Sequence, residues 1–542
     1  MPQAEPSASS PRYGRRNEPL TRRRYRVAST RTYGVDNRSA TVRRLLRRCP
    51  MLCVTRYAIA AVSITLALAR CKDPAAPPGT RPTMSIGSVS ASENGKYIVV
   101  FTGDNAPADF AARVSARGGT VETVLDGVGV AVVSGLTHAA AGDLASTQDI
   151  NAVEPDITIG SDSPEEPAGA DAAEAEAADA SSVALTESHA SPAGARYYAR
   201  QWNLRAIKAN AAWDAGYLGS SDVTVFILDT GIDYLQPDLV GRVDLSRSVS
   251  FVPSEDALVA SKFPGRHPIT DLHSHGTAVA ALIASNADSL AGVTQQTTLV
   301  GVKVHDRTRT GPVDNYIRGI KYAADHGADV IHLSIPFIDF KKDSLPGLIA
   351  AINRALNYAH RKGAVLVAAA GNMSSDLDHD QDRWRFCNGV HVICVSATAP
   401  TAAAGVNGPW ENVDAVAPTT NFGRSAISVA GPGGAGPGGG AAPNTAVWVT
   451  CSTAGLVTIG NPRPCSQGAL RWQSSGNTFG AAVTSGLAAL LISTMGKGQP
   501  DQIRAAIEKS ADDLGEPGTD PYYGRGRINV ARAVGALVQL RP

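Results

Sequence analysis

Strand-like and helix-like patterns alternate along the second half of the chain. Continuous runs of Val, Ile, Leu and Ala, as expected for strands buried on both faces, lie at 223–228, 299–304, 330–334, 364–370 and 391–397. Helical runs lie between them, at 276–287, 315–327 and 345–363. The alternation predicts an α/β domain at 197–540, with a doubly wound, mostly parallel sheet and helices on both faces. Such sheets bind ligands at the carboxyl ends of their strands.

A smaller unit is predicted at 96–160, ahead of the α/β domain. Its apolar pattern runs as strand, helix, two strands joined by a tight turn, a second helix and a last strand. That order, β-α-β-β-α-β, is typical of a ferredoxin-like α+β fold. Residues 161–196 are rich in Ala, Asp, Glu and Ser and lack large apolar side chains, so we expect a disordered acidic linker. We expect a second linker at 72–95 and loops at 401–471.

The first 71 residues differ in composition from the rest. Of the formal net charge of +1, residues 1–50 contribute +10, from thirteen arginines against three acidic residues, which leaves −9 for the remainder. The apolar run at 57–69 is shorter than the about 20 residues of a transmembrane helix. After a basic segment, it predicts an export signal. Met51 is an alternative start. Cys71 lies in a lipoprotein-like sequence, but Arg70 stands where a small residue is usual, so export without a lipid anchor is favoured over an outer-membrane lipoprotein.

Composition narrows the class of protein and of partner. Apolar residues make up 43% of the chain, as in soluble globular proteins rather than fibrous or multi-span membrane proteins. The negative charge of the remainder argues against nucleic acid as a partner. Four of the seven cysteines lie beyond the leader, an even number that favours disulfides in an exported protein. Short spacing suggests the pairs Cys387–Cys394 and Cys451–Cys465, and buried free thiols are the alternative.

Three polar residues stand at strand ends or helix starts, where active-site groups are usually mounted. Asp229 ends VFILD, His275 precedes a glycine in DLHSHGTAVAA, and Asn372 follows the strand VLVAAAG. Each alone is most simply a turn, cap or structural residue. A fourth segment, SSGNTFGAAVTSG at 474–486, opens a long apolar helix at Thr478. The four segments together are far more specific than any one of them.

Their order and spacing resemble those of the subtilisin-like serine peptidases, the subtilases, over residues 201–534. The resemblance implies peptide-bond hydrolysis by a hydroxyl nucleophile, a His general base and an orienting Asp, here Thr478, His275 and Asp229. Asn372 would donate to the oxyanion, together with a backbone N–H at the start of the helix. The unit at 96–160 resembles the inhibitory propeptide of secreted members. The chemistry implies no required cofactor.

The nucleophile position departs from the family pattern. Where subtilases have G-T-S-M-A-x-P-H-V-A-G, this chain has GNTFGAAVTSG, so Thr478 replaces the nucleophilic Ser and Phe479 replaces Met. The Thr478 methyl restricts χ1 and adds bulk where substrate and imidazole meet. Ser474 and Ser475 precede the glycine, and moving either into register would break the alignment of the helix. We therefore expect neither to replace Thr478.

The same resemblance assigns the substrate side. LSIP corresponds to the strand that pairs with the substrate backbone, and AAAG to the wall of the specificity pocket; these residues are Ser334, Ile335, Pro336, Ala369, Ala370 and Gly371. Pro336 lacks an N–H for backbone pairing, and small pocket walls favour a large apolar substrate side chain. Structural calcium is common in the family. The acidic loop at 374–382 is more simply a solvated loop, and no calcium ligands are assigned.

Two functions remain open from the sequence. The first is an exported subtilisin-like endopeptidase that acts on proteins or peptides and binds its own propeptide at 96–160. The second is a catalytically inactive relative that binds peptide segments, because Thr478 replaces the usual nucleophile. Under the first hypothesis, the substitution Thr478→Ser is expected to raise activity.

Overall fold

The structure is a computed structural model that describes residues 95–160, 191–335, 340–341, 344–380, 383–436, 441–456 and 471–535. The leader with its predicted export signal and Cys71, the linker at 72–94 and the acidic residues 161–190 lie outside the described residues. One predicted boundary is wrong. The acidic linker was expected to extend to residue 196, but Pro192–Gly194 form a 3-10 turn and Ala195 is buried in the core.

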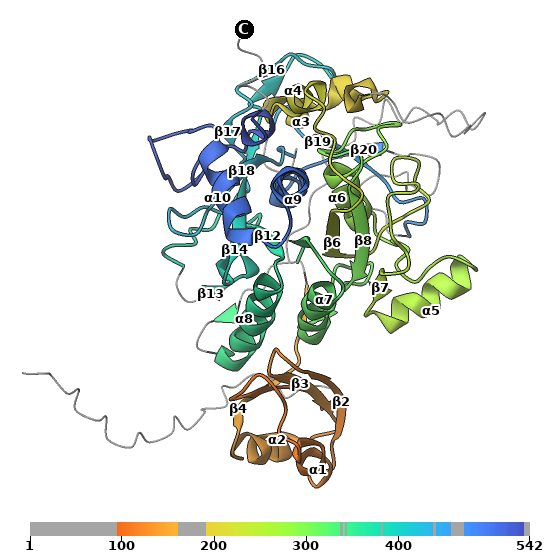
Figure 1. The fold of residues 1–542 in the computed structure, drawn as a ribbon, viewed down its shortest axis with the longest axis vertical. Coiled ribbons are helices and arrows are strands. Elements are labelled where there is room, and N and C mark those ends of the chain that lie inside the picture. Colours follow the sequence, from red (N-terminus) through yellow and green to blue (C-terminus); the bar gives the residue numbers. More distant parts are fainter. Residues whose placement is uncertain are drawn as a thin grey trace, which may run out of the picture. The chain divides into compact units, whose positions relative to one another are not determined.

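An eight-stranded, mostly parallel sheet confirms the predicted α/β fold class (Figure 1). Its strand order is β17-β14-β12-β10-β6-β8-β7, and β18 also pairs with β14. All pairings are parallel except that of β14 with β17. The strands are β6 (Thr224–Asp229), β7 (Val249–Ser250), β8 (Thr298–Lys303), β10 (Val330–Leu333), β12 (Val365–Ala369), β14 (Val392–Ala399), β17 (Ala415–Val416) and β18 (Val429–Pro432).

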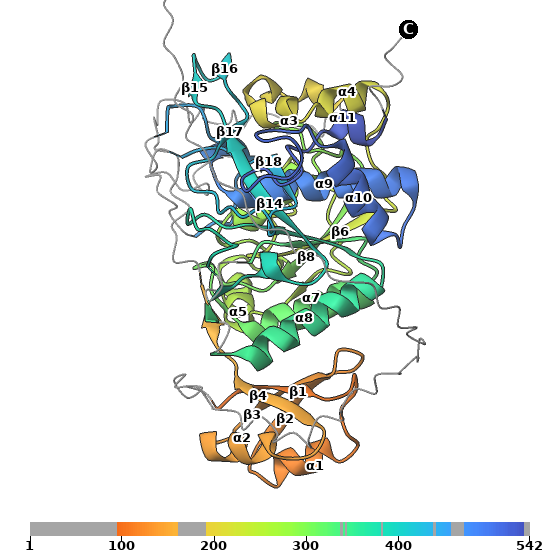
Figure 2. The same ribbon diagram turned by 90° about the vertical axis from the view of Figure 1, so that its left-hand side faces the viewer.

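Successive residues of a strand point to opposite faces of the sheet, and in these strands both sets are apolar. Both faces are therefore covered by helices. On β6, Val225 and Ile227 belong to the core that contains α6 and α9, whereas Phe226 and Leu228 belong to the core that contains α7 and α8. The two helix layers can be followed on opposite sides of the sheet in Figure 2. The helices are α6 (His275–Ile283), α7 (Val313–Asp325), α8 (Pro346–Arg361) and α9 (Asn477–Met495).

Among the described residues, α9 is the one helix that is long and apolar enough to cross a membrane, with a mean hydropathy of 1.5. Within this helix, 83% of the most apolar 18-residue stretch is buried in the protein. It is therefore the central helix of the core rather than an exposed apolar segment. Four further helices contribute to the same core: α3 (Trp202–Ala206), α4 (Ala209–Asp214), α10 (Pro500–Ser510) and α11 (Val530–Ala533).

Some elements differ from the sequence-based prediction. The helix expected at 276–287 ends at Ile283, because Ala284 is extended and forms a bridge with Thr294. The region 401–471 was expected to form loops, yet it supplies β18 and β19 (Val447–Thr450), and β19 pairs antiparallel with β20 (Arg471–Ser474). Helix α5 (Pro253–Lys262) was not predicted, because Val259 is its only buried apolar residue.

The segment 97–155 has the predicted element order and folds as a four-stranded antiparallel sheet with two helices. The strand order is β2-β3-β1-β4, and one face packs on the two helices. The other face, which includes Ile98 and Val100, shares an apolar cluster with α7 and α8. The elements are β1 (Tyr97–Phe101), α1 (Phe110–Ser115), β2 (Thr120–Leu125), β3 (Val130–Ser134), α2 (His138–Ala145) and β4 (Ile150–Pro155).

Candidate active site

Asp229 and His275 form a buried pair at the carboxyl edge of the sheet. Asp229 is the last residue of β6, and His275 is the first residue of α6. The Nδ1 atom of His275 lies 2.8 Å from Oδ1 and 2.9 Å from Oδ2 of Asp229. Burial alone would raise the pKa of the Asp229 carboxyl. The charge and hydrogen bond of His275 outweigh that effect and hold this pKa below its usual range, so Asp229 is ionised.

The turn before α6 brings the imidazole against β6. A Cβ on Gly276 would collide with the carbonyl oxygen of Gly231 and come within 3.1 Å of Asp229 Cβ, so only glycine allows this approach. Ser274 has a left-handed φ of +102°, a strain that costs on the order of 1–3 kcal/mol. The Asp271 carboxylate offsets it by accepting the backbone N–H of Ser274 at 2.9 Å. The turn therefore holds His275 in a fixed place.

Helix α9 begins beside this imidazole. Thr478 is its second residue and is 6% exposed. The ring of the next residue, Phe479, lies 6.2 Å from the His275 ring, measured between centroids. The first-turn N–H groups of a helix lack intrahelical partners, so the start of α9 presents N–H groups and a positive dipole end here.

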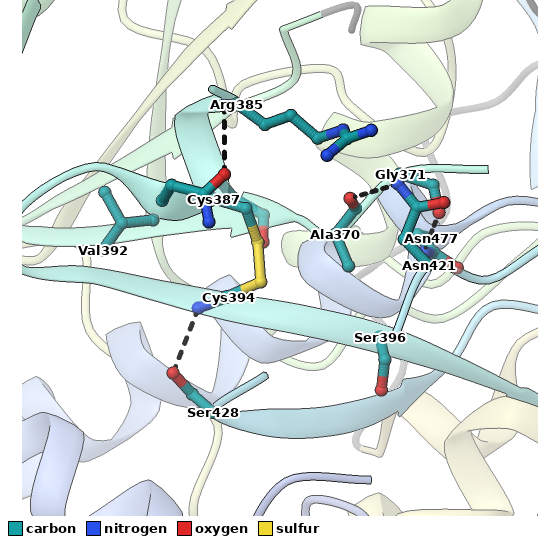
Figure 3. The surroundings of a disulfide bond; sticks show 12 residues. Ala370, Gly371, Arg385, Cys387, Val392, Cys394, Ser396, Asn421, Ser428 and Asn477 are labelled. Atoms are coloured by element: carbon teal, nitrogen blue, oxygen red, sulfur yellow. Dashed lines mark hydrogen bonds between the residues drawn. A yellow bond between two sulfur atoms is a disulfide. The ribbon is translucent and has the colours of Figure 1, made fainter. Parts of the chain in front are cut away.

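Two asparagines connect the end of β12 to the start of α9. The backbone N–H of Asn477 donates to Oδ1 of Asn372 at 2.8 Å, and the Asn477 side-chain amide donates to the carbonyl oxygen of Gly371. Because the Asn372 oxygen is engaged, its amide N–H groups are the part of the side chain that can serve a substrate. Asn421 donates its side-chain amide to Ala370 O at 2.9 Å, which fixes the same strand end (Figure 3). The role of Asn477 was not predicted, and its only signal was the departure from Thr in the family pattern.

Two buried histidines lie near the pair and were also not predicted. His332, on β10, contacts Ser485 Oγ through Nδ1 at 2.9 Å and Ser334 Oγ through Nε2 at 2.7 Å. Burial lowers the pKa of His332 to about 4 and that of His305 to about 3, so both are neutral at neutral pH. The backbone N–H of His305 lies 3.4 Å from Asp229 O. The sequence did carry a signal for each: His332 interrupts the apolar strand run at 330–334, and His305 directly follows the run at 299–304.

The predicted substrate-side residues come from neighbouring parallel strands, since Leu333 of β10 is in register with Ala368 of β12. Ser334 is buried with its hydroxyl turned to His332, and Ile335 is half-buried. Pro336 lies outside the described residues. At the end of β12, Ala369 is half-buried, while Ala370 and Gly371 are buried. The structure thus places the described part of this set at one edge, beside Asn372.

A short strand of the α/β domain takes its partner from the unit at 96–160. Strand β5 (Thr158–Ile159) pairs antiparallel with β9 (Gly311–Pro312), just before α7. Oδ1 of Asp156 accepts the backbone N–H of Asp314 at 3.0 Å, within the first turn of α7. Lys96 lies between these carboxylates, with Nζ 2.7 Å from Asp314. Residues 156–159, at the end of the unit, are therefore held against the α/β domain, and β5 is an added strand beside β9.

A second carboxylate of this unit caps a helix. Oε1 of Glu154 accepts the backbone N–H of Gly347 at 3.1 Å, in the first turn of α8. Burial raises the pKa of Glu154 to about 6. Burial and the neighbouring Asp314 raise that of Asp156 to about 7. Both acids thus hold protons to a higher pH here than they would in water.

The structure joins Cys387 to Cys394 by a disulfide, beneath the strand end that carries Gly371 (Figure 3). Cys451 is also disulfide-bonded, and its predicted partner Cys465 lies outside the described residues. In the acidic loop at 374–382, Asp376 contacts His379 at 2.7 Å and Asp378 accepts the hydroxyl of Ser425 at 2.6 Å. The carboxylates of Asp376 and Asp378 therefore have hydrogen-bond partners within the protein.

Both a family model and individual known proteins match more than half of this chain. The family model described as the subtilase family matches residues 220–526. A thermophilic serine proteinase of Bacillus sp. (strain AK1) is 30% identical over 342 residues, which cover 62% of this chain and 68% of that protein. Thermitase of Thermoactinomyces vulgaris is 29% identical over 341 residues, or 62% of this chain and 97% of the relative.

Solved structures show the same fold at lower identity. The epidermin leader peptide processing serine protease EpiP of Staphylococcus aureus superposes with a TM-score of 0.61 at 20% identity, covering 83% of this chain and all of that chain. Fervidolysin of Fervidobacterium pennivorans gives a TM-score of 0.58 at 21% identity, covering 83% of this chain and 62% of that chain.

Proposed function

Because this chain belongs to the subtilase family of serine peptidases, we propose that it is an exported endopeptidase that uses the Thr478 hydroxyl as its nucleophile. The observation that carries the proposal is the buried Asp229–His275 pair, with Nδ1 2.8 Å from the carboxylate, beside the start of α9. A carboxylate so placed fixes the imidazole tautomer and stabilises its protonated form. That arrangement is the one that a histidine general base requires.

In the proposed reaction, Nε2 of His275 takes the proton of the Thr478 hydroxyl as its oxygen attacks the carbonyl carbon of the substrate. The negative charge that develops on the carbonyl oxygen is stabilised by the amide N–H groups of Asn372 and the backbone N–H of Thr478. The His275 imidazolium then protonates the leaving amine, and the acyl-threonine ester forms. Water, deprotonated by the same imidazole, hydrolyses the ester and regenerates the hydroxyl.

Protein or peptide segments are the substrates in this proposal. The adjacent ends of β10 and β12 would contact the substrate backbone, with Ala369 and Ala370 as small walls for a large apolar side chain. The unit at 96–160 would act as the propeptide. Its support is the pairing of β5 with β9, which adds an extended segment to the edge of the α/β domain as a substrate would be added.

Export is part of the same proposal. The Cys387–Cys394 disulfide is typical of proteins that fold in oxidising compartments. The apolar run at 57–69 after a basic segment supplies an export signal by its sequence. The export route ends in the periplasm or the extracellular medium, without a lipid on Cys71.

A second function is favoured by one specific observation. Threonine stands at position 478, where the subtilases have serine, and its extra methyl restricts the rotamers that the hydroxyl can adopt at the buried start of α9. A chain that kept the fold but lost the reaction would bind peptide segments at the same strand ends. Reactivity of the intact chain separates the two functions.

Self-processing is the test of the proposed function. The purified full-length chain is expected to cleave itself within the segment 161–195, and a His275→Ala variant is expected to stay intact. A Ser485→Ala variant, which removes a hydroxyl that contacts His332, serves as the matched control and should still be processed. An intact wild-type chain, or equal cleavage in the His275→Ala variant, would exclude the proposed peptidase and favour the peptide-binding relative.

A further inference from the structure

A cluster of three metal-binding side chains lies at the opposite edge of the sheet from the candidate active site. It consists of His360 near the end of α8, His391 just before β14, and Asp501 in the first turn of α10. One ligand atom from each residue lies within 4.8 Å of the other two. Because His391 precedes its strand whereas Asp229 ends one, the two sites lie at opposite ends of the parallel strands.

The contacts within the cluster hold the three groups together from different elements. His360 Nε2 lies 3.1 Å from Oδ1 of Asp501, and the two imidazole rings stack with centroids 3.8 Å apart. Nε2 of His391 contacts Oδ1 of Asn357 at 3.2 Å, which anchors the ring to α8. An outer-shell partner of this kind is what orients histidine ligands in metal sites. His391 is also held at a left-handed φ of +64°, which directs its side chain to this point.

We propose that His360, His391 and Asp501 form a binding site for Zn²⁺ or a similar borderline divalent transition metal. Imidazole nitrogens and a carboxylate oxygen are the donors that Zn²⁺ takes at about 2.0–2.2 Å, and three protein ligands with one water give its usual four-coordinate geometry. Hard cations such as Ca²⁺ and Mg²⁺ prefer six or more oxygen ligands and are not suited to this set.

Binding requires only a small rearrangement. The donor atoms must approach one another to about 3.3 Å, because that is the edge of a tetrahedron whose metal–ligand bonds are about 2.0–2.2 Å long. His391 and Asp501 are exposed, so the His391 ring can rotate off the His360 ring, and the Asp501 carboxylate can move with it, without disturbing the core. Arg504, whose positive charge acts on His391, is engaged by Glu508 at 2.8 Å. A metal here would connect α8, the start of β14 and α10, and would stabilise the folded domain without entering the reaction.

The test is Zn²⁺ binding to the untagged full-length chain, measured by calorimetric titration and by thermal unfolding. The wild type is expected to bind one more Zn²⁺ than the His391→Ala variant and to unfold at a higher temperature with Zn²⁺, a shift that the variant lacks. The exposed Asp501→Asn variant, which is expected to fold normally, should bind Zn²⁺ at least about tenfold more weakly. The His379→Ala variant is the matched control, because His379 forms another exposed His–Asp pair, at 2.7 Å, and does not belong to the three-residue cluster.

Cobalt substitution gives an independent readout. Co²⁺ in the wild type should show the visible absorption of a four-coordinate site, and this band should be absent from the His391→Ala and Asp501→Asn variants and present in His379→Ala. Unchanged Zn²⁺ stoichiometry and affinity in the His391→Ala and Asp501→Asn variants would overturn the proposal. So would a Co²⁺ band that these substitutions leave intact.

Discussion

Removal of the Thr478 methyl is expected to accelerate the reaction. Asp229 and His275 are already in contact at 2.8 Å, so the base needs no further organisation. What remains is the placement of the nucleophile: Thr478 is buried in the first turn of α9, and its branched side chain has few allowed rotamers. A displacement of about 1 Å costs on the order of 10² in rate, or about 2.7 kcal/mol of barrier. Thr478→Ser should therefore raise kcat/KM by about 10².

The assay is the initial rate of hydrolysis of a chromogenic peptide, with the concentration of active sites measured by burst titration. Thr484→Ser is the matched control. It removes a methyl from a buried threonine two turns further along α9, where Oγ1 donates to Gly480 O at 2.8 Å, and it should leave kcat/KM unchanged. Thr478→Ala should reduce the wild-type rate by at least about 10³. A serine variant no faster than the wild type would refute the argument that the methyl limits catalysis.

Three further outcomes follow from the contacts described. Asn372→Ala should lower kcat by about 10²–10³ with little change in KM, as when the corresponding donor of a subtilisin is removed, and an unchanged kcat would exclude Asn372 as an oxyanion donor. Glu154 keeps its proton to about pH 6 in the folded chain, against 4.5 as its ordinary value, so the wild type loses stability as pH rises through this window. Glu154→Gln should therefore match the wild type at pH 4 and exceed it by about 2 kcal/mol at pH 8 in chemical unfolding; equal stability at both pH values would contradict this. Replacing Cys387 and Cys394 together by alanine removes a cross-link over seven residues and should lower the free energy of unfolding by about 2.5 kcal/mol, whereas no loss would show that the bond does not constrain the chain.

The central strands were predictable because burial on both faces leaves short, continuous runs of Val, Ile, Leu and Ala. The same pattern placed the candidate site residues, since Asp229 directly follows a strand run, Asn372 lies two residues after the run at 364–370, and His275 precedes the glycine that opens the predicted helix at 276. Helix α5 escaped prediction because it packs on the domain through so few apolar residues. Strand β19 escaped because its partner, β20, lies more than twenty residues away and no local pattern records that pairing.

The parts of the site that could not be predicted depend on contacts between distant segments. The Asn477 bridge joins residues more than one hundred positions apart, and a lone asparagine at a helix start is otherwise an ordinary cap. His332 bonds to Ser485 across 153 positions, so its neutral state follows from burial that the sequence alone does not state. Similarly, the three residues of the proposed zinc site lie on elements that meet only in the folded domain.

Labelling of the nucleophile tests the central claim most directly. The wild-type chain should be treated with a fluorophosphonate and digested, and the modified residue located by mass spectrometry. The account predicts a single phosphonylated peptide that carries the label on Thr478, and no label in the His275→Ala variant. A wild-type chain that remains unlabelled while Thr478→Ser is labelled, or a label on any other residue, would contradict it.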